Sequence, residues 1–220
     1  MIDGTVIMAE NQYAGRGQHQ NGWHAEPGKN LTFSLLLKPS FLSITNQFDL
    51  VRAVSLGVFD ALNPLLGDKL KIKWPNDIYY AERKLGGMLI ENIIQGTQIK
   101  NAVIGIGLNV NQDEFPAHLP NPVSVKQILH QDYDLKALLS EICRHIEKYY
   151  LSLKAGNISL IRKAYSQQLY WLNELRSFKT GESVFKGAIA GVRDDGKLII
   201  QNNISGEKEF SLKEIEFLNI

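Results

Sequence analysis

Two short segments carry side chains whose chemistry suits an anionic ligand. In "GRGQHQNGW", two glycines flank Arg16, so backbone N–H groups and a guanidinium can approach an anion closely. In "KWPNDIYYAERKLGG", a proline-stiffened turn presents Asn76 and Asp77 seven residues before Lys84. A carboxylate can hold a metal that neutralises phosphate charge, and an ammonium can stabilise the negative charge that develops during adenylation. The residues alone leave a mobile surface loop, a turn aspartate and a solvated lysine open as alternatives.

Neither of the common nucleotide-binding motifs is present in the glycine-containing segments. "GRGQHQNGW" lacks the G-x-x-x-x-G-K-[S/T] spacing of a phosphate-cradling P-loop. "GIGLNV" lacks the third glycine and the following helix of the dinucleotide fingerprint. Any nucleotide chemistry must therefore depend on a different arrangement.

Composition bounds the class of protein before any fold is considered. With 220 residues, 44% hydrophobic and 21% charged, the chain can bury the core of one domain, or of one domain plus a small appendage. A formal charge of +1 gives no overall reason to expect nucleic acid as a partner. The single cysteine and the absence of a signal-peptide pattern favour the cytoplasm, and no apolar run approaches the roughly 20 residues of a membrane span.

The elements that must position these segments follow from hydrophobic periodicity. Period-two or continuous apolar runs predict strands over residues 5–11, 31–37 and 69–74, and a hairpin of strands 85–94 and 101–110. Spacings of three and four predict helices over about 46–66, 135–153 and 159–170. From residue 181 onward, short alternating strands separated by turns predict a β-barrel of about 45 residues packed on the main unit. This mixture of elements is typical of an α+β or α/β protein.

Taken together and in order, "GRGQHQNGW", "KWPNDIYY" followed by "RKLGG", and "GIGLNVN" resemble the signature segments of biotin protein ligase (biotin-[acetyl-CoA-carboxylase] ligase). The resemblance covers essentially the whole chain. It implies an enzyme that makes biotinyl-5'-adenylate from biotin and ATP with Mg²⁺. That enzyme then forms a carbon–nitrogen bond to one lysine of the biotin carboxyl carrier domain of acetyl-CoA carboxylase.

The same resemblance implies a fold and a domain division. The expected fold is α+β, with a mixed β-sheet and packed helices like those of class II aminoacyl-tRNA synthetases and biotin ligases. Residues 1–176 would form the biotin- and ATP-binding catalytic domain, and residues 177–220 a small SH3-like barrel. The cytoplasm remains the expected compartment, no DNA or membrane partner is expected, and a homodimer stays open.

The site residues are likewise implied by resemblance, with the polar stretch around Arg16 as a loop that closes over biotin and the adenylate. The catalytic residues would be Arg16, Asp77 and Lys84, and Asp77 would also hold Mg²⁺. Biotin would contact Gln12, Gly15, Arg16, Gly17, Lys84, Gly86, Gly87, Gly105 and Gly107. ATP would contact Arg16, Gln18, Trp23, Asn76, Lys84 and Asn109. By contrast, Trp74 is interpreted as a core residue, and Lys71 and Lys73 as residues that keep a strand soluble.

Two departures from the family pattern bear on activity. Many members carry further arginines in the loop where this chain has Gln18 and Asn21, and a glycine where it has Gln20. Glutamine at position 18 does occur in the family, and the other departures leave the cationic character of the loop mainly to Arg16. The S-T-N segment that usually precedes the first motif is missing, so either the polypeptide is truncated or activity would be impaired. No helix-turn-helix segment supports a repressor role. The alternatives are a lipoate or octanoate protein ligase or transferase of the same fold, and a non-catalytic biotin-binding module.

Overall fold

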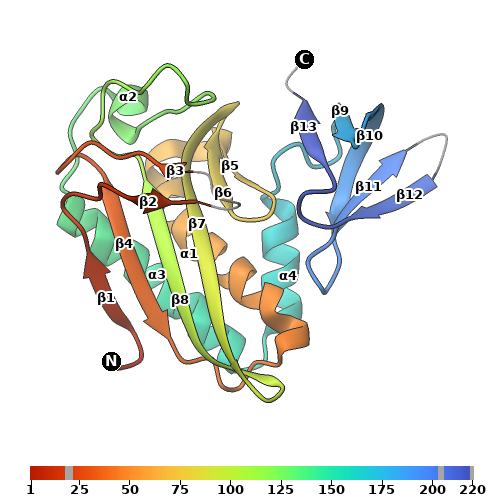
Figure 1. Ribbon diagram of the computed structural model, residues 1–220, viewed down its shortest axis with the longest axis horizontal. Coiled ribbons are helices and arrows are strands. Elements are labelled where there is room, and N and C mark those ends of the chain that lie inside the picture. The colour runs from red at the N-terminus through yellow and green to blue at the C-terminus, as the bar shows by residue number, and fades with distance from the viewer. Residues whose placement is uncertain (18–21, 203–205, 219–220) are drawn as a thin grey trace.

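The computed structural model describes residues 1–17, 22–202 and 206–218, and its main body is a six-stranded sheet backed by helices (Figure 1). The strand order is β1-β4-β8-β7-β6-β5. In that order the strands span Thr5–Met8, Leu31–Leu37, Gln98–Leu108, Arg83–Gln95, Asp77–Tyr80 and Leu70–Lys73. Every neighbouring pair is antiparallel, so the predicted mixed sheet is wrong. The reason is that β5 to β8 follow one another through tight turns, which join antiparallel neighbours.

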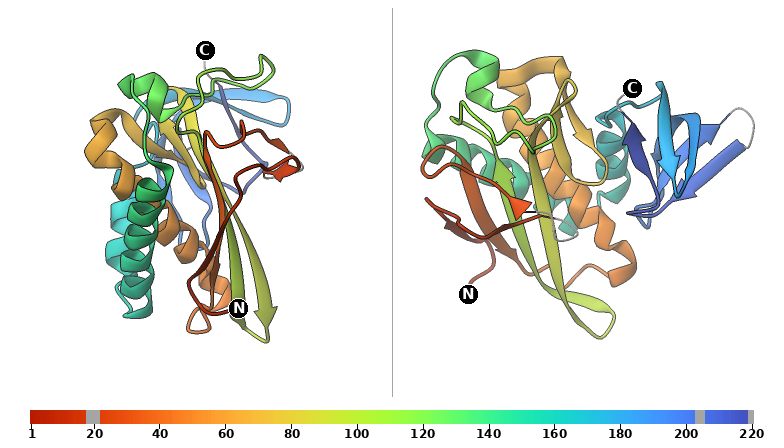
Figure 2. Two further views of the ribbon diagram at one scale, coloured as in Figure 1. Left: turned by 90° about the vertical axis from the view of Figure 1, so that its left-hand side faces the viewer. Right: turned by 45° about the horizontal axis from the view of Figure 1, so that its top comes forward.

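Helices cover one face of this sheet and leave the other face to the loop after β1 (Figure 2). The helices are α1 (Gln47–Leu66), α2 (Val125–Leu129), α3 (Leu135–Lys154) and α4 (Ile158–Gln167), with short 3₁₀ turns at Ile44–Asn46 and Gly67–Lys69. Helix α1 fills the core against α3, and Gly57 permits this packing because a Cβ there would lie 2.6 Å from Ile146 Cα. By length and composition alone, residues 44–69 could cross a membrane, but 67% of their apolar window is buried, as in a core helix.

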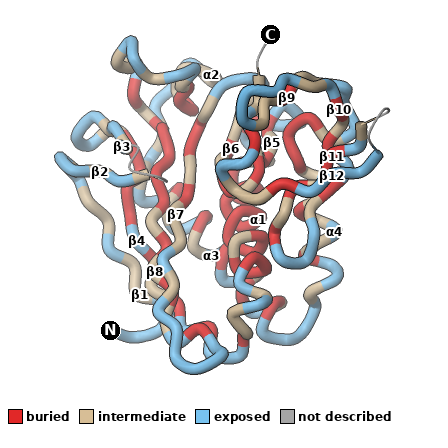
Figure 3. The backbone as a smooth tube through the Cα atoms, turned by 45° about the vertical axis from the view of Figure 1, so that its right-hand side comes forward, coloured by how far each residue is buried: buried red, intermediate tan, exposed pale blue. Residues whose placement is uncertain are grey.

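A second sheet of five strands follows α4, in the order β12-β11-β10-β9-β13. The strands span Leu175–Thr180 (β9), Ser183–Val192 (β10), Leu198–Asn202 (β11), Gly206–Phe210 (β12) and Glu216–Leu218 (β13). Within the described residues the two edge strands, β12 and β13, are not paired with each other, so the sheet is open and the predicted closed barrel is not confirmed. Its buried residues, red in Figure 3, belong to the same core cluster as those of the main body.

Periodicity predicted most of the elements, including the short strands β1 and β5 and helix α4. The helices expected over 46–66 and 135–153, the 85–110 hairpin and the strand over 31–37 are confirmed. The structure adds α2, which a capping box of Ser124 and Gln127 initiates. It also adds strand β9 and a small hairpin of β2 (Gly15–Arg16) with β3 (Gly22–Trp23).

Candidate functional site

A cavity of about 310 Å³ lies between the open face of the six-stranded sheet and the loop that holds β2 and β3. Such a volume falls at the lower end of small-molecule pockets. The strands supply its apolar part, Asp77 and Lys84 form a charged end, and Arg16 lies at the rim beside Glu91. The lining residues are Ile7, Ala9, Gln12, Arg16, Gly17, Gly22, Trp23, Thr32, Phe33, Ser34, Asp77, Lys84, Gly87, Met88, Leu89, Gly105, Ile106 and Gly107.

The strand register gives the cavity a floor without side chains. Gly107 lies opposite Thr32 of β4 and Gly87 of β7, so two neighbouring strands present glycine at the same level. A Cβ on Gly87 would lie 2.7 Å from Asp77 Oδ1, so any larger residue would displace that carboxylate. The glycine at position 87 thus makes room for a charged protein group beside the ligand space.

Asp77 and Lys84 form an ion pair at the charged end of the cavity. Lys84 Nζ donates to Asp77 Oδ2 at 2.7 Å, and the two side chains are 33% and 28% exposed. The pairing of β6 with β7 shifts register between Ile78 and Tyr79. Without this bulge, Lys84 and Gly87, three residues apart, would face opposite sides of the sheet. The bulge brings both residues to the cavity. Asp77 and Lys84, which were predicted from the sequence to act together, therefore lie side by side there.

Lys73 is a second cation near this pair, and the sequence interpretation missed it. Lys73 lies opposite Asp77 in the β5–β6 register, and its Nζ donates to the Tyr79 hydroxyl at 3.2 Å. The ammonium also lies 4.9 Å from the ring centroid of Phe217 in the second sheet. Burial lowers the pKa of Lys73, and the nearby Asp77 carboxylate partly offsets this decrease. Lys73 is therefore packed between two aromatic rings instead of being a solvated strand residue.

The loop after β1 is attached to the floor of the cavity by Trp23. A Cβ on Gly107 would lie 2.3 Å from Trp23 Cε2, so the indole rests directly on the glycine backbone. Gly15 has a different role, because its Cβ would lie 2.3 Å from Trp23 O and would break the β2–β3 pairing. Within the described residues, Trp23 Nε1 and Gln12 Oε1 are buried without a hydrogen-bond partner. The indole N–H donor and the amide oxygen acceptor therefore remain for a ligand beside this loop.

Arg16 lies at the exposed rim of the same cavity. Its Nη2 is 3.5 Å from a carboxylate oxygen of Glu91 on β7, and 76% of the side chain is exposed. An ion pair that exposed holds the arginine weakly, so the guanidinium can exchange its partner for a ligand anion. Gln18, predicted to contact ATP, lies outside the described residues.

Besides Gly15, three predicted site residues of the described chain lie outside the cavity lining. Asn76 is buried, and its Nδ2 donates to Met88 O at 2.6 Å. Asn109 is buried too, donating from Nδ2 to Val123 O at 3.1 Å. A Cβ on Gly86 would lie 2.7 Å from Gly107 O, so this glycine allows close strand packing. Their predicted ligand contacts stay predictions; in the structure each asparagine side chain donates to a backbone carbonyl.

The sequence interpretation also missed the apolar side chains that line the cavity, such as Ile7 and Leu89. Strand alternation carries the signal, since Leu89 and Ser34 lie opposite Gly105 and share its face of the sheet. No three metal-ligating side chains gather anywhere in the described part of the chain. Asp77 is the carboxylate that lines the cavity. The arrangement is a cavity lined by apolar residues and by Thr32 and Ser34, with Lys84 and Asp77 beside Gly87 and Arg16 at the rim, paired with Glu91. It suits a ligand with an apolar body and an anionic head.

Comparison with known proteins gives consistent similarities. Residues 2–109 match the family model described as the biotin/lipoate A/B protein ligase family. The chain is 30% identical over 213 residues to the bifunctional ligase/repressor BirA of Bacillus subtilis (strain 168), covering 95% of this chain but 65% of that protein. It thus spans just under two thirds of that relative. Identity to the biotin--[acetyl-CoA-carboxylase] ligase of Paracoccus denitrificans is 29%, covering 89% and 83% of the two chains.

A solved structure extends the similarity to the whole fold. The biotin protein ligase from Aquifex aeolicus, in complex with biotin and ATP, superposes with a TM-score of 0.83 at 27% identity. The match covers 99% of this chain and 90% of that one. The second, open sheet is thus included in the likeness.

Proposed function

We propose that the chain is a biotin protein ligase of the biotin/lipoate A/B protein ligase family, whose model residues 2–109 match. It would activate biotin with ATP to biotinyl-5'-adenylate and transfer biotin to a lysine of a carrier domain. The observation that carries this proposal is the Lys84 ammonium, 2.7 Å from Asp77 Oδ2, at the charged end of a cavity that lies against the sheet. A carboxylate and a polyphosphate can meet only where a cation offsets their repulsion.

The two steps assign separate tasks to the chain's residues. In the first, a biotin carboxylate oxygen bonds to the α-phosphorus while the bond to pyrophosphate breaks, and Lys84 stabilises the charge at that centre. Arg16 would leave Glu91 for the phosphate, and Trp23 would exclude water from the mixed anhydride. In the second, the carrier amine bonds to the biotin carbonyl, AMP leaves with the electron pair, and the amine loses its proton.

The residues at the charged end fit a magnesium ion delivered with ATP. Mg²⁺ is commonly held by one or two carboxylates together with substrate phosphates, and Asp77 supplies one carboxylate in the cavity. The bound metal would neutralise phosphate charge. Asn76 would support this arrangement by fixing the turn before Asp77 through its bond to Met88 O.

The remaining assignments are part of the same proposal. The carrier would be the biotin carboxyl carrier domain of acetyl-CoA carboxylase, and the compartment the cytoplasm. Residues 177–220 would act as a small SH3-like domain and residues 1–176 as the catalytic domain. Neither DNA nor membrane binding is part of the proposed activity, and a homodimer remains an open alternative.

Biotin-dependent exchange of labelled pyrophosphate into ATP tests the first step. We expect exchange with biotin and Mg²⁺, and little with lipoate or octanoate at equal concentration. Transfer is tested by blotting a purified carrier domain with labelled streptavidin. Preferential exchange with lipoate would favour the lipoate ligase alternative, and biotin binding without exchange would favour a non-catalytic module.

A further inference from the structure

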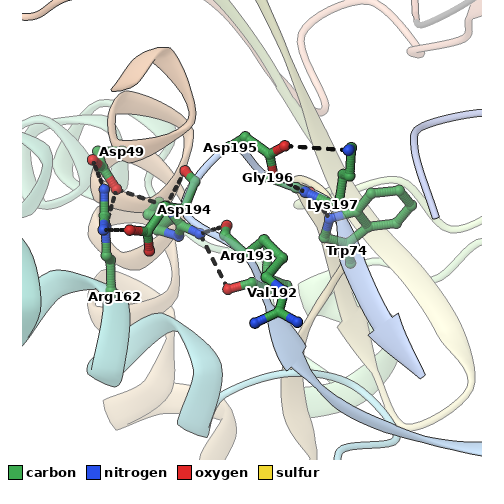
Figure 4. Close-up of polar contacts among 10 residues, drawn as sticks. Asp49, Trp74, Arg162, Val192, Arg193, Asp194, Asp195, Gly196 and Lys197 are labelled. Atoms are coloured by element: carbon green, nitrogen blue, oxygen red, sulfur yellow. Dashed lines mark hydrogen bonds and ion pairs between the residues drawn. The ribbon is translucent and has the colours of Figure 1, made fainter. Parts of the chain in front are cut away.

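The turn between β10 and β11, residues 193–197, is held by the helices of the main body as well as by its own sheet (Figure 4). Fully buried Arg52 of α1 donates to the backbone carbonyls of residues 192, 193 and 194. Arg162 of α4 bridges Asp49 of α1, at 2.8 Å, and the Asp194 side chain of the turn, at 2.6 Å. Two arginines and two aspartates thus fasten the turn to two helices.

The same turn contacts the segment that leads into Asp77. Trp74 Nε1 donates to Gly196 O at 2.9 Å (Figure 4). Gly196 has φ +99°, and a Cβ there would lie 2.4 Å from Phe48 Cδ2, so glycine lets the turn lie flat on α1. The carbonyl that accepts from Trp74 is therefore fixed by close packing.

A second hydrogen bond fixes the next residue of that segment. The hydroxyl of buried Tyr165, on α4, donates to Pro75 O at 2.6 Å. Its ring packs edge-on against Phe48, which lies under the Arg52 guanidinium. One connected set of contacts therefore runs from the turn of the second sheet to the two residues that stand two and three positions before Asp77.

We propose that the 193–197 turn positions the Asp77–Lys84 pair for ATP, with Trp74 and Tyr165 as the positioning residues. Neither side chain lines the cavity, so each acts through the backbone that carries Asp77. Buried ion networks add little net stability compared with apolar packing, but they define geometry, and here the geometry is that of a carboxylate facing Lys84. This inference rests on the proposed ligase function.

The test uses variants that remove one polar group and keep the packing. Trp74→Phe and Tyr165→Phe each delete one donor, and Asp194→Asn weakens the turn at a side chain that is 78% exposed, where the fold should survive. Arg193→Gln is the matched control, because its side chain pairs with Glu207 and Glu209 inside the second sheet. ATP KM is measured by pyrophosphate exchange, and biotin Kd by calorimetry.

If these residues position the Asp77–Lys84 pair, their loss should change ATP KM and leave biotin Kd nearly unchanged. We expect ATP KM to rise about fivefold in each of the three variants, as for loss of one net hydrogen bond, with biotin Kd changed less than twofold. The control should match the unaltered chain in both. Equal ATP KM in all variants, or parallel changes in ATP KM and biotin Kd, would overturn this inference alone. Absence of exchange in the unaltered chain would overturn the proposed function as well.

Discussion

Replacing Lys84 by methionine removes the ammonium but keeps a side chain of similar length on β7. In the structure this ammonium lies 2.7 Å from Asp77 Oδ2 and borders the cavity with one third of its side chain exposed. The variant leaves the bulge, the glycine floor and the strand pairing unchanged. Its effect should therefore fall on charge stabilisation and leave the fold intact.

The expected loss of catalytic rate is much larger than the expected loss of folding stability. Losing one preorganised charge at a reacting centre costs about 3 kcal/mol of barrier, which corresponds to roughly a 100-fold slower adenylation step. Losing a partly exposed ion pair costs at most about 1 kcal/mol of folding stability. Activity should thus fall by two orders of magnitude while the free energy of unfolding changes little.

The assay pairs biotin-dependent pyrophosphate exchange with urea unfolding. Lys126→Met is the control, since Lys126 pairs with Asp113 at 2.9 Å and with Asp132 at 3.0 Å, has a side chain 25% exposed and lies outside the cavity. The control should lose a similar amount of stability and keep its exchange rate. Near-normal exchange by Lys84→Met would refute the assigned role, and so would equal losses of exchange in both variants.

Three further outcomes are expected. Gly107→Val should displace the Trp23 indole and lower biotin affinity at least tenfold, measured by calorimetry and tryptophan fluorescence; unchanged affinity would show that this strand does not border the ligand. Arg16→Gly should release the adenylate, so that stray lysines are biotinylated more often and the adenylate protects residues 13–29 less against proteolysis. No rise in stray labelling would contradict the proposal that this loop closes over the adenylate. Because burial lowers the pKa of Lys73, its charge opposes folding at neutral pH, and this penalty disappears as pH rises through the lowered pKa towards 10.5. Lys73→Met should therefore gain stability relative to the parent at pH 7 and lose that gain above pH 10, measured by urea unfolding at both pH values, whereas a constant difference would contradict the argument.

Much of the fold could be predicted because its long elements carry their own periodicity. The helix over residues 46–66 and the 85–110 hairpin each bury a face that the spacing of apolar residues marks unambiguously. The charged end of the site was also accessible, since one short segment carries both Asp77 and Lys84. Strand β9 was missed because "LRSFKT" is short and polar, and its pairing with β10 and β13 stabilises it.

The parts that could not be predicted depend on contacts between distant segments. The bulge that turns Lys84 towards the cavity arises from the register of two strands. Lys73 is half-buried because the second sheet brings Phe217 over it, from a position far along the chain. Neither the bulge nor the contact with Phe217 can be inferred from local sequence patterns, so Lys73 was interpreted as a solvated strand residue.

The glycines show why composition alone could not assign roles. Gly86 permits two backbones to approach, Gly87 leaves room for the Asp77 carboxylate, and Gly107 receives the indole of Trp23. Sequence reasoning assigned all three to ligand space, but each accommodates a different protein group. For Gly107 the consequence is functional, because the surface expected to hold biotin is covered by the proposed lid.

This contact changes how closure of the loop must be understood. Within the described residues the loop contacts the sheet through Trp23 on Gly107 and through the ion pair of Arg16 with Glu91. Biotin or the adenylate favours the closed loop only if its contacts with the loop are more stabilising than the loop contacts that it replaces. An apolar ligand face would take over the indole, and a phosphate would take over the guanidinium from an exposed carboxylate. Since the second exchange replaces a weak, solvated pair by a charge-assisted one, the adenylate should close the loop more strongly than biotin alone.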